Sequence, residues 1–147
     1  MSRESYLNRF GLTFHHLGLA VKRPDAAIAF LEALGYKIGE VVFDALQTVN
    51  VVMCSHESMP SIEIIFPAEG TSPIDRFLQR HKEGLVYHMC FETRDIESSL
   101  SKVKADKALQ LIDVSPPTPA VLFGGDLVSF YLIEGVGLIE IISRPQS

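Results

Sequence analysis

The tetrapeptide Ile-Glu-Ile-Ile occurs twice in this 147-residue chain, as Ile62-Glu63-Ile64-Ile65 and as Ile139-Glu140-Ile141-Ile142. β-Branched residues favour strands, so both copies are predicted to be strands. A carboxylate among isoleucines is costly to bury unless its charge is matched. Both glutamates therefore predict a cavity-lining face, and a bound cation would match their charge.

A second repeated pattern precedes each copy. Phe14-His15-His16-Leu17-Gly18-Leu19-Ala20-Val21 and Val86-Tyr87-His88-Met89-Cys90-Phe91-Glu92-Thr93 are both apolar, strand-like runs in which a His or an aromatic residue stands directly before a His. Glu63 follows His16 by 47 residues, and Glu140 follows His88 by 52. These similar separations indicate one structural unit used twice, with different loop lengths.

The residues between each His strand and its Glu strand predict a helix and two further strands. The first helix begins at Pro24-Asp25 and ends at Gly35, and the second has Asp95 as its N-cap residue. In the first half, the two further strands are expected at 37–43 and 48–54, and the strand with Glu63 at 61–66. In the second half, the two further strands are expected at 109–114 and 127–133, and the strand with Glu140 at 138–143.

This order predicts an α+β domain built from two βαβββ modules. We expect an N-terminal extension over residues 1–13 and a single domain over residues 14–143. Module one covers about 14–67, a linker helix covers about 72–82, and module two covers about 86–143. A chain of this length can bury enough surface to fold as one domain.

Composition excludes several classes of function. The formal net charge of −5 argues against a nucleic-acid partner, which normally requires a basic surface. No apolar run approaches the roughly 20 residues of a membrane-spanning helix, and the polar residues before the first strand are not expected to act as a signal peptide. Cys54 and Cys90 are therefore expected to be free thiols in a reducing compartment, and the protein to be cytoplasmic.

The repeated His and Glu residues are predicted to bind a metal ion. Related modules would bring two imidazoles and two carboxylates together, and Gly18 and Cys90 would share their strand faces and leave room for a concave site. This ligand set suits one divalent ion (Co, Mn, Ni, Zn or Fe) with open coordination positions. The four candidate ligands are His16, Glu63, His88 and Glu140.

Neighbouring residues are assigned other roles. His15 directly precedes a candidate ligand, so it is predicted to face away from the site and to be structural. Both cysteines are expected to be small buried hydrophobic residues. Gln47, Asn50 and Tyr131 are weaker candidates for substrate contacts, with ordinary strand or turn hydrogen bonding as the alternative for each.

The paired modules, with their His, Glu, His and Glu, resemble the vicinal oxygen chelate superfamily. That group includes glyoxalase I, bleomycin-resistance proteins, extradiol dioxygenases and methylmalonyl-CoA epimerases. The resemblance covers about residues 14–143 and implies a vicinal-oxygen-chelate half-barrel that pairs as a homodimer. The segments most similar to the epimerases are 61–65, 72–74, 77–78, 83–85, 95–97 and 137–140.

The resemblance to the epimerases implies a divalent-metal-dependent isomerase or epimerase that transfers the α-proton of a small acyl thioester. The resemblance implies that the metal ligands of such enzymes correspond to the four candidate ligands of this chain. Glu140 is the candidate catalytic base. The epimerases normally carry a second proton-transfer glutamate where this chain has Leu46. Asp44, two positions earlier, shares the face of Leu46 in an extended chain.

Two other functions remain open at this point. Glyoxalase I uses the same ligand set for the hemithioacetal of methylglyoxal and glutathione, so a lactoylglutathione lyase is one alternative. A non-catalytic, resistance-type small-molecule-binding protein is the other, although such relatives typically lack the complete ligand set. The carboxylate of Glu63 disfavours an extradiol dioxygenase, which needs two His and one Glu around Fe(II).

Overall fold

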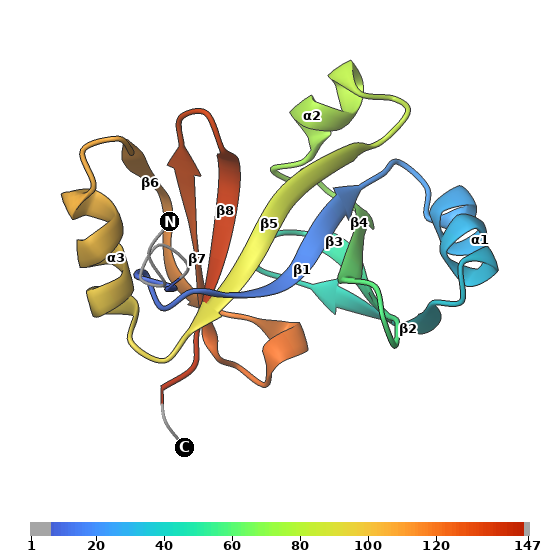
Figure 1. Cartoon of the computed structure of the whole chain (residues 1–147). Helices are drawn as coiled ribbons and strands as arrows, with labels where there is room; N and C mark the ends of the chain where they lie inside the picture. The colour runs from blue at the N-terminus through green and yellow to red at the C-terminus, as the bar shows by residue number, and fades with distance from the viewer. Residues whose placement is uncertain (1–6, 146–147) are drawn as a thin grey trace.

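The computed structural model describes residues 7–145 and contains the repeated unit twice (Figure 1). Module one contains β1 (Thr13–Ala20), α1 (Asp25–Ala33), β2 (Lys37–Asp44), β3 (Val49–Ser55) and β4 (Ser61–Pro67). The linker helix α2 (Asp75–Arg80) follows. Module two contains β5 (Leu85–Thr93), α3 (Ile96–Ala105), β6 (Leu111–Pro119), the 3-10 turn η2 (Val121–Phe123), β7 (Leu127–Ile133) and β8 (Gly137–Ser143). The prediction of two βαβββ modules is confirmed.

The eight strands within residues 7–145 form one open mixed sheet in the order β2-β3-β4-β1-β5-β8-β7-β6. The two His strands, β1 and β5, are antiparallel neighbours at the centre of the sheet. Each His strand also lies parallel to the Glu strand of its own module, β1 to β4 and β5 to β8. The sheet does not close on itself, which agrees with the predicted half-barrel.

Each module buries its own helix against its strands, at opposite ends of the molecule (Figure 1). In module one, Leu31 of α1 packs with Val52 and Ile64 of the sheet. In module two, Leu100 of α3 packs against the cluster that contains Ile141. Because side chains alternate along a strand, the opposite face of the same strands remains for a site.

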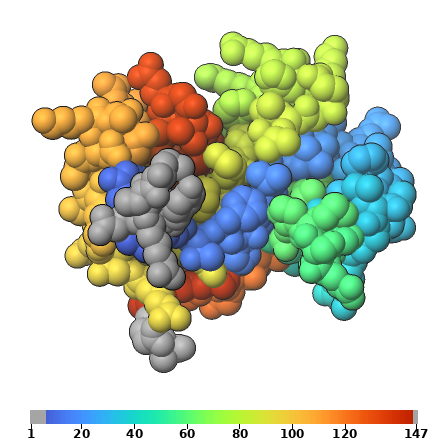
Figure 2. Space-filling model, viewed as in Figure 1, coloured from blue at the N-terminus to red at the C-terminus, as the bar shows by residue number. Residues whose placement is uncertain are grey.

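The linker helix is shorter than the predicted 72–82, because it begins at Asp75 and ends at Arg80. The backbone N–H and the hydroxyl of Ser72 both donate to the Asp75 carboxylate at 2.9 Å, so the two residues close a turn before the helix. The helix and the β7–β8 turn both project from the same edge of the molecule (Figure 2). Among residues 7–145, no helix is long and apolar enough to span a bilayer.

Strand β6 ends at Pro119 rather than at the predicted residue 114. Proline lacks the N–H that a ladder needs and is therefore confined within sheets to edge strands, strand starts and bulges. β6 is an edge strand paired only with β7, so Pro116 and Pro117 lose no hydrogen bond to a second neighbour. At the other end of the chain, β1 begins at Thr13, inside the predicted extension, and residues 1–6 lie outside the described part.

Candidate metal centre

The pairing of the central strands brings the two modules together at two equivalent points. Gly18 of β1 lies opposite Glu63 on one side and opposite His88 on the other. Cys90 of β5 lies opposite Glu140 on one side and opposite His16 on the other. Each His is therefore next to the small residue of the other module, which is the pseudo-twofold arrangement expected from the repeat.

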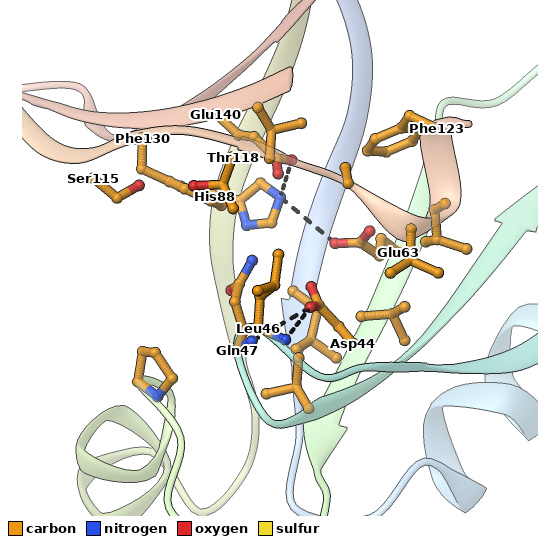
Figure 3. A pocket seen from close by; sticks show the side chains of 18 of the residues that line it. Asp44, Leu46, Gln47, Glu63, His88, Ser115, Thr118, Phe123, Phe130 and Glu140 are labelled. Atoms are coloured by element: carbon orange, nitrogen blue, oxygen red, sulfur yellow. Dashed lines mark hydrogen bonds and ion pairs between the residues drawn. The ribbon is translucent and has the colours of Figure 1, made fainter. Parts of the chain in front are cut away.

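The four candidate ligands converge within a single chain. The two imidazole Nε2 atoms, of His16 and His88, are 3.2 Å apart. The Glu140 Oε1 atom lies 3.3 Å from the first and 3.1 Å from the second. The Glu63 Oε1 atom lies 3.7 and 3.8 Å from the same two nitrogens. Figure 3 shows Glu63 and Glu140 reaching His88 from different sides.

All four side chains are buried, with relative exposures of 0% for His16, 6% for Glu63, 3% for His88 and 5% for Glu140. One potential ligand atom from each lies within 4.8 Å of all the others. Buried charges at such distances need a counter-charge. Two imidazole nitrogens and two carboxylate oxygens that face one point fit a divalent cation of the borderline type.

Protonation equilibria show the same demand for positive charge. Burial alone would lower the pKa of His16, but hydrogen bonds and charges from Glu140 and Glu63 outweigh it and raise the pKa to about 9. Burial would raise the pKa of Glu140, but its contacts with His16 and His88 hold that pKa well below its usual range. The site therefore stabilises a cation, whether a proton or a metal ion.

A cavity of about 410 Å³ lies beside the four candidate ligands, and three of them, Glu63, His88 and Glu140, line its wall. Its walls are mainly apolar and come from both modules and from η2, as Val51, Ile65, Leu122, Phe123 and Phe130 illustrate. Asp44 and Gln47 contribute polar groups at the β2–β3 turn (Figure 3). A mostly apolar pocket with a few convergent polar groups is typical of a small-molecule site.

Two phenylalanines that sequence reasoning did not single out hold the imidazoles in place. Phe123 stacks on His16 with ring centroids 5.8 Å apart, and Phe130 contacts His88 edge-on at 5.6 Å. Phe130 lies opposite Glu140 in the β7–β8 pair. Its alternation with the cavity-lining Val128 along β7 is a sequence signal, but only the strand pairing shows what it faces.

The three predicted substrate-contact residues do not lie together. Gln47 lines the cavity. Asn50 does not, because its neighbours Val49 and Val51 are the residues of β3 that face the cavity. Tyr131 is also misplaced by the prediction, since it is 4% exposed in the core and its hydroxyl donates to Ser129 Oγ at 2.8 Å.

The prediction that His15 faces away from the site is wrong. The β1–β5 register shifts between Phe14 and His16, and this irregularity brings the Nδ1 atom of His15 to 2.8 Å from Nδ1 of His16. Burial, followed by the nearby charge of His16, lowers the pKa of His15. A bulge that breaks the alternation of side chains has no recognisable signal in this sequence.

The two cysteines are buried and unpaired, as predicted. Burial, and then the charge of Glu140, raises the pKa of the Cys90 thiol. Burial also raises the pKa of Cys54. Both thiols therefore stay protonated and act as small hydrophobic groups rather than as nucleophiles.

This fold and ligand arrangement place the protein in a known class. Residues 15–121 match the family model described as the Glyoxalase/Bleomycin resistance protein/Dioxygenase superfamily, and the chain belongs to that superfamily. It is 31% identical over 100 residues to the mitochondrial methylmalonyl-CoA epimerase of Mus musculus, a match that covers 67% of this chain and 56% of the relative. The chain thus spans little more than half of that relative's length.

Solved structures with the same fold include epimerases. The crystal structure of methylmalonyl-CoA epimerase from Mycobacterium tuberculosis is 18% identical, with a TM-score of 0.71 over 92% of this chain and 89% of that one. A variant of the Streptomyces coelicolor methylmalonyl-CoA epimerase in complex with 2-nitronate-propionyl-CoA is 22% identical, with a TM-score of 0.70 over 92% and 99%. At these identities the likeness establishes the fold.

Proposed function

We propose that this chain is a divalent-metal-dependent epimerase or isomerase that transfers the α-proton of a small acyl thioester. The observation that carries the proposal is the clustering of the four buried candidate ligands, three of which line one mainly apolar cavity of about 410 Å³. The likeness to methylmalonyl-CoA epimerase over two thirds of the chain supports the choice of substrate class. The side chains that line the cavity would determine which acyl thioester the protein binds.

A divalent cation held by the four candidate ligands would polarise neighbouring oxygens of the acyl group and lower the cost of removing the adjacent proton. The apolar rings of Phe123 and Phe130 flank the imidazoles and exclude water from this end of the cavity. In a site with little water, each fixed charge acts more strongly on the substrate than it would at the surface.

Glu140 is the candidate base. Its carboxylate lines the cavity and stays ionised, because its contacts with His16 and His88 keep its pKa low. An ionised carboxylate at the cavity wall can accept a proton from a bound substrate once the acidity of that proton has been raised. Glu63 also lines the cavity but lies farther from both imidazoles, and we assign it to cation binding.

Inversion of the configuration at the α-carbon requires a second group, which returns a proton to the face of the substrate opposite to the one that lost it. Leu46 lines the cavity but has no exchangeable proton. Asp44 lines the same region, and its Oδ1 atom accepts hydrogen bonds from the backbone N–H groups of Leu46 at 3.0 Å and Gln47 at 3.3 Å. This leaves the second carboxylate oxygen, Oδ2, for the substrate. Asp44 is therefore our candidate for the second proton-transfer group.

The proposal also covers the oligomeric state of the enzyme, its cellular compartment and the identity of its metal ion. We infer that it forms homodimers, as its resemblance to this superfamily implies. Two buried free thiols suit a reducing compartment, and we place the protein in the cytoplasm. The metal ion would be one of Co, Mn, Ni, Zn or Fe, because these tolerate a mixed imidazole and carboxylate set.

The test begins with the metal content of protein purified without chelator, compared with that of Glu140→Ala. About one equivalent of a divalent transition metal in the wild type, and much less in the variant, is expected for a single site built on these ligands. The metal-loaded protein is then assayed for α-proton exchange of acyl-CoA thioesters in heavy water. Exchange supports the proposal.

The other outcomes of this assay distinguish the alternatives. Turnover of the hemithioacetal of methylglyoxal and glutathione, without exchange of any thioester, would indicate the lyase. No metal in the wild type, even after soaking in Co, Mn, Ni and Zn, would overturn the metalloenzyme and leave a binding protein of the same fold.

A further inference from the structure

We propose that His15 is a positioning residue that holds the ring of His16 in the tautomer and orientation needed to bind the metal ion. The inference rests on the proposed metal site and deepens it. The main observation behind it is that the Nδ1 atoms of these two adjacent imidazoles lie 2.8 Å apart.

The two nitrogens of His16 face different partners. Nε2 lies within 3.7 Å of carboxylate oxygens of Glu140 and Glu63, and Nδ1 faces His15. Metal binding through Nε2 requires its lone pair, so the proton of neutral His16 must be on Nδ1. His15 Nδ1 must then accept that hydrogen bond and carry its own proton on Nε2.

Within the described part of the chain, His15 is the only hydrogen-bond partner of His16 Nδ1. His16 is 0% exposed, so bulk water does not reach its ring. The thiol of Cys90, which shares a potential ligand cluster with both imidazoles, is directed to the carbonyl oxygen of Phe91 at 3.7 Å. His15 is consequently the group that decides which nitrogen of His16 is free for a cation.

Packing fixes the relative orientation of the two rings. Phe123 contacts His15 edge-on at 5.3 Å and stacks on His16 at 5.8 Å, so one phenyl ring holds both imidazoles. The bulge before His16 turns His15 toward the site. Ligating imidazoles usually donate their second N–H to an acceptor that fixes tautomer and ring orientation.

The second module shows that this support is specific to His16. Tyr87 is the residue directly before His88, and its ring meets the imidazole edge-on at 5.5 Å. The Nδ1 atom of His88 is buried and has no hydrogen-bond partner among residues 7–145. The two modules thus differ at this position, and His15 supports only the ligand of module one.

The test compares three variants by Co²⁺ titration, following the absorption of bound Co²⁺. His15→Phe keeps an aromatic ring but removes the acceptor, and His15→Asn keeps an acceptor oxygen near the position of Nδ1. His81→Phe is the matched control, because the imidazole of His81 lies outside the site, with its Nδ1 atom 3.5 Å from the Glu83 carboxylate. Thermal unfolding of each variant checks that it folds.

We expect His15→Phe to weaken Co²⁺ binding by about 10- to 100-fold, because a loss of this size is typical when a group that orients a metal ligand is removed. The visible spectrum of bound Co²⁺ should change as well. His15→Asn should recover most of the affinity, and His81→Phe should match the wild type. In the Zn²⁺-loaded protein, nitrogen NMR should find a proton on Nδ1 of His16 and none on Nδ1 of His15.

Three results would overturn the role of His15. One is wild-type affinity in His15→Phe, a second is no recovery in His15→Asn, and the third is a proton on Nδ1 of His15 in the Zn²⁺-loaded protein. If the wild type binds Co²⁺ and Zn²⁺ normally, these results leave the proposed metal site intact. A wild type that binds neither ion overturns the metal site and the role of His15 together.

Discussion

The backbone of Gly18 lies against the imidazole ring of His88, at a distance that leaves no room for a side chain. A Cβ atom added to Gly18 would lie 2.7 Å from Nε2 of His88, inside normal contact distance. In the sheet, Gly18 lies between two of the candidate ligands, opposite Glu63 of β4 on one side and opposite His88 of β5 on the other. The His88 ring occupies the space that a side chain of residue 18 would fill. The glycine is therefore needed for space.

Gly18→Ala should displace the His88 ring. We expect at least about 10-fold weaker Co²⁺ binding, because a shifted ligand loses its geometry, and about 1–3 kcal/mol lower stability from overpacking. Metal titration and denaturant unfolding measure the two effects.

Gly135→Ala is the matched control for this substitution. Nothing lies within 4 Å of a Cβ added at Gly135, but its φ of +83° makes the substitution strained. It should lower stability by about 1 kcal/mol without changing Co²⁺ affinity. Equal metal affinity in the Gly18 and Gly135 variants would contradict the proposed role of His88 as a ligand.

Glu140→Gln should abolish most of the proton transfer while keeping an oxygen that can contact a cation. A positioned general base contributes about 10²- to 10⁴-fold, so we expect a rate loss of at least about 10²-fold in deuterium exchange. Glu63→Gln makes the same chemical change at the other carboxylate and should retain measurable exchange. A larger loss in Glu63→Gln than in Glu140→Gln would reverse the assignment of the base.

Asp44→Asn separates proton transfer from the structure of the β2–β3 turn. The amide oxygen can still accept the hydrogen bonds from Leu46 and Gln47 that Asp44 Oδ1 accepts. The turn should therefore persist while inversion slows by at least about 10-fold, since the second carboxylate is gone. Inversion of a single enantiomer, followed by circular dichroism, measures the effect.

Leu46→Glu provides the complementary gain. Leu46 is 63% exposed, so the substitution should change stability by no more than about 0.5 kcal/mol. Combined with Asp44→Asn, it should restore inversion by supplying a new carboxylate at the cavity wall. If Asp44→Asn inverts substrate at the wild-type rate, Asp44 is not the second proton-transfer group.

Metal binding should release a proton at neutral pH. The Glu140 and Glu63 carboxylates raise the pKa of His16 to about 9 against the opposing effect of burial, so this imidazole is protonated in the metal-free protein at pH 7. A cation at Nε2 displaces that proton. Below pH 9 the metal affinity should rise about 10-fold per pH unit, with about one proton released per ion.

Calorimetric titration with Zn²⁺ at pH 7.5, in two buffers of different ionisation enthalpy, counts the released protons. In Glu140→Gln the carboxylate charge next to His16 is lost, so the release should be smaller. Equal apparent enthalpies in both buffers for the wild type would mean that His16 is already neutral.

Much of this protein could be predicted from its sequence, because the relevant signals are local. Strand and helix periodicity predicted both modules, and strand β7 was placed at its observed bounds, Leu127–Ile133. The N-cap prediction was also confirmed, since the Asp95 side chain accepts a hydrogen bond from the N–H of Ser98. The four candidate ligands were chosen because the chain repeats them, and a repeat can be seen without knowing the fold.

Tertiary structure decided everything that depends on which strands are neighbours. The order of the sheet places β1 next to β5, and only this pairing unites the ligands of both modules within one chain. Asn50 and Tyr131 were misassigned because polarity does not reveal which face of a strand meets the cavity. His15 was misassigned because a bulge, fixed by pairing with β5, interrupts the alternation of side chains. The sequence determined the two modules and the choice of candidate ligands, whereas long-range strand pairing determined what each side chain faces.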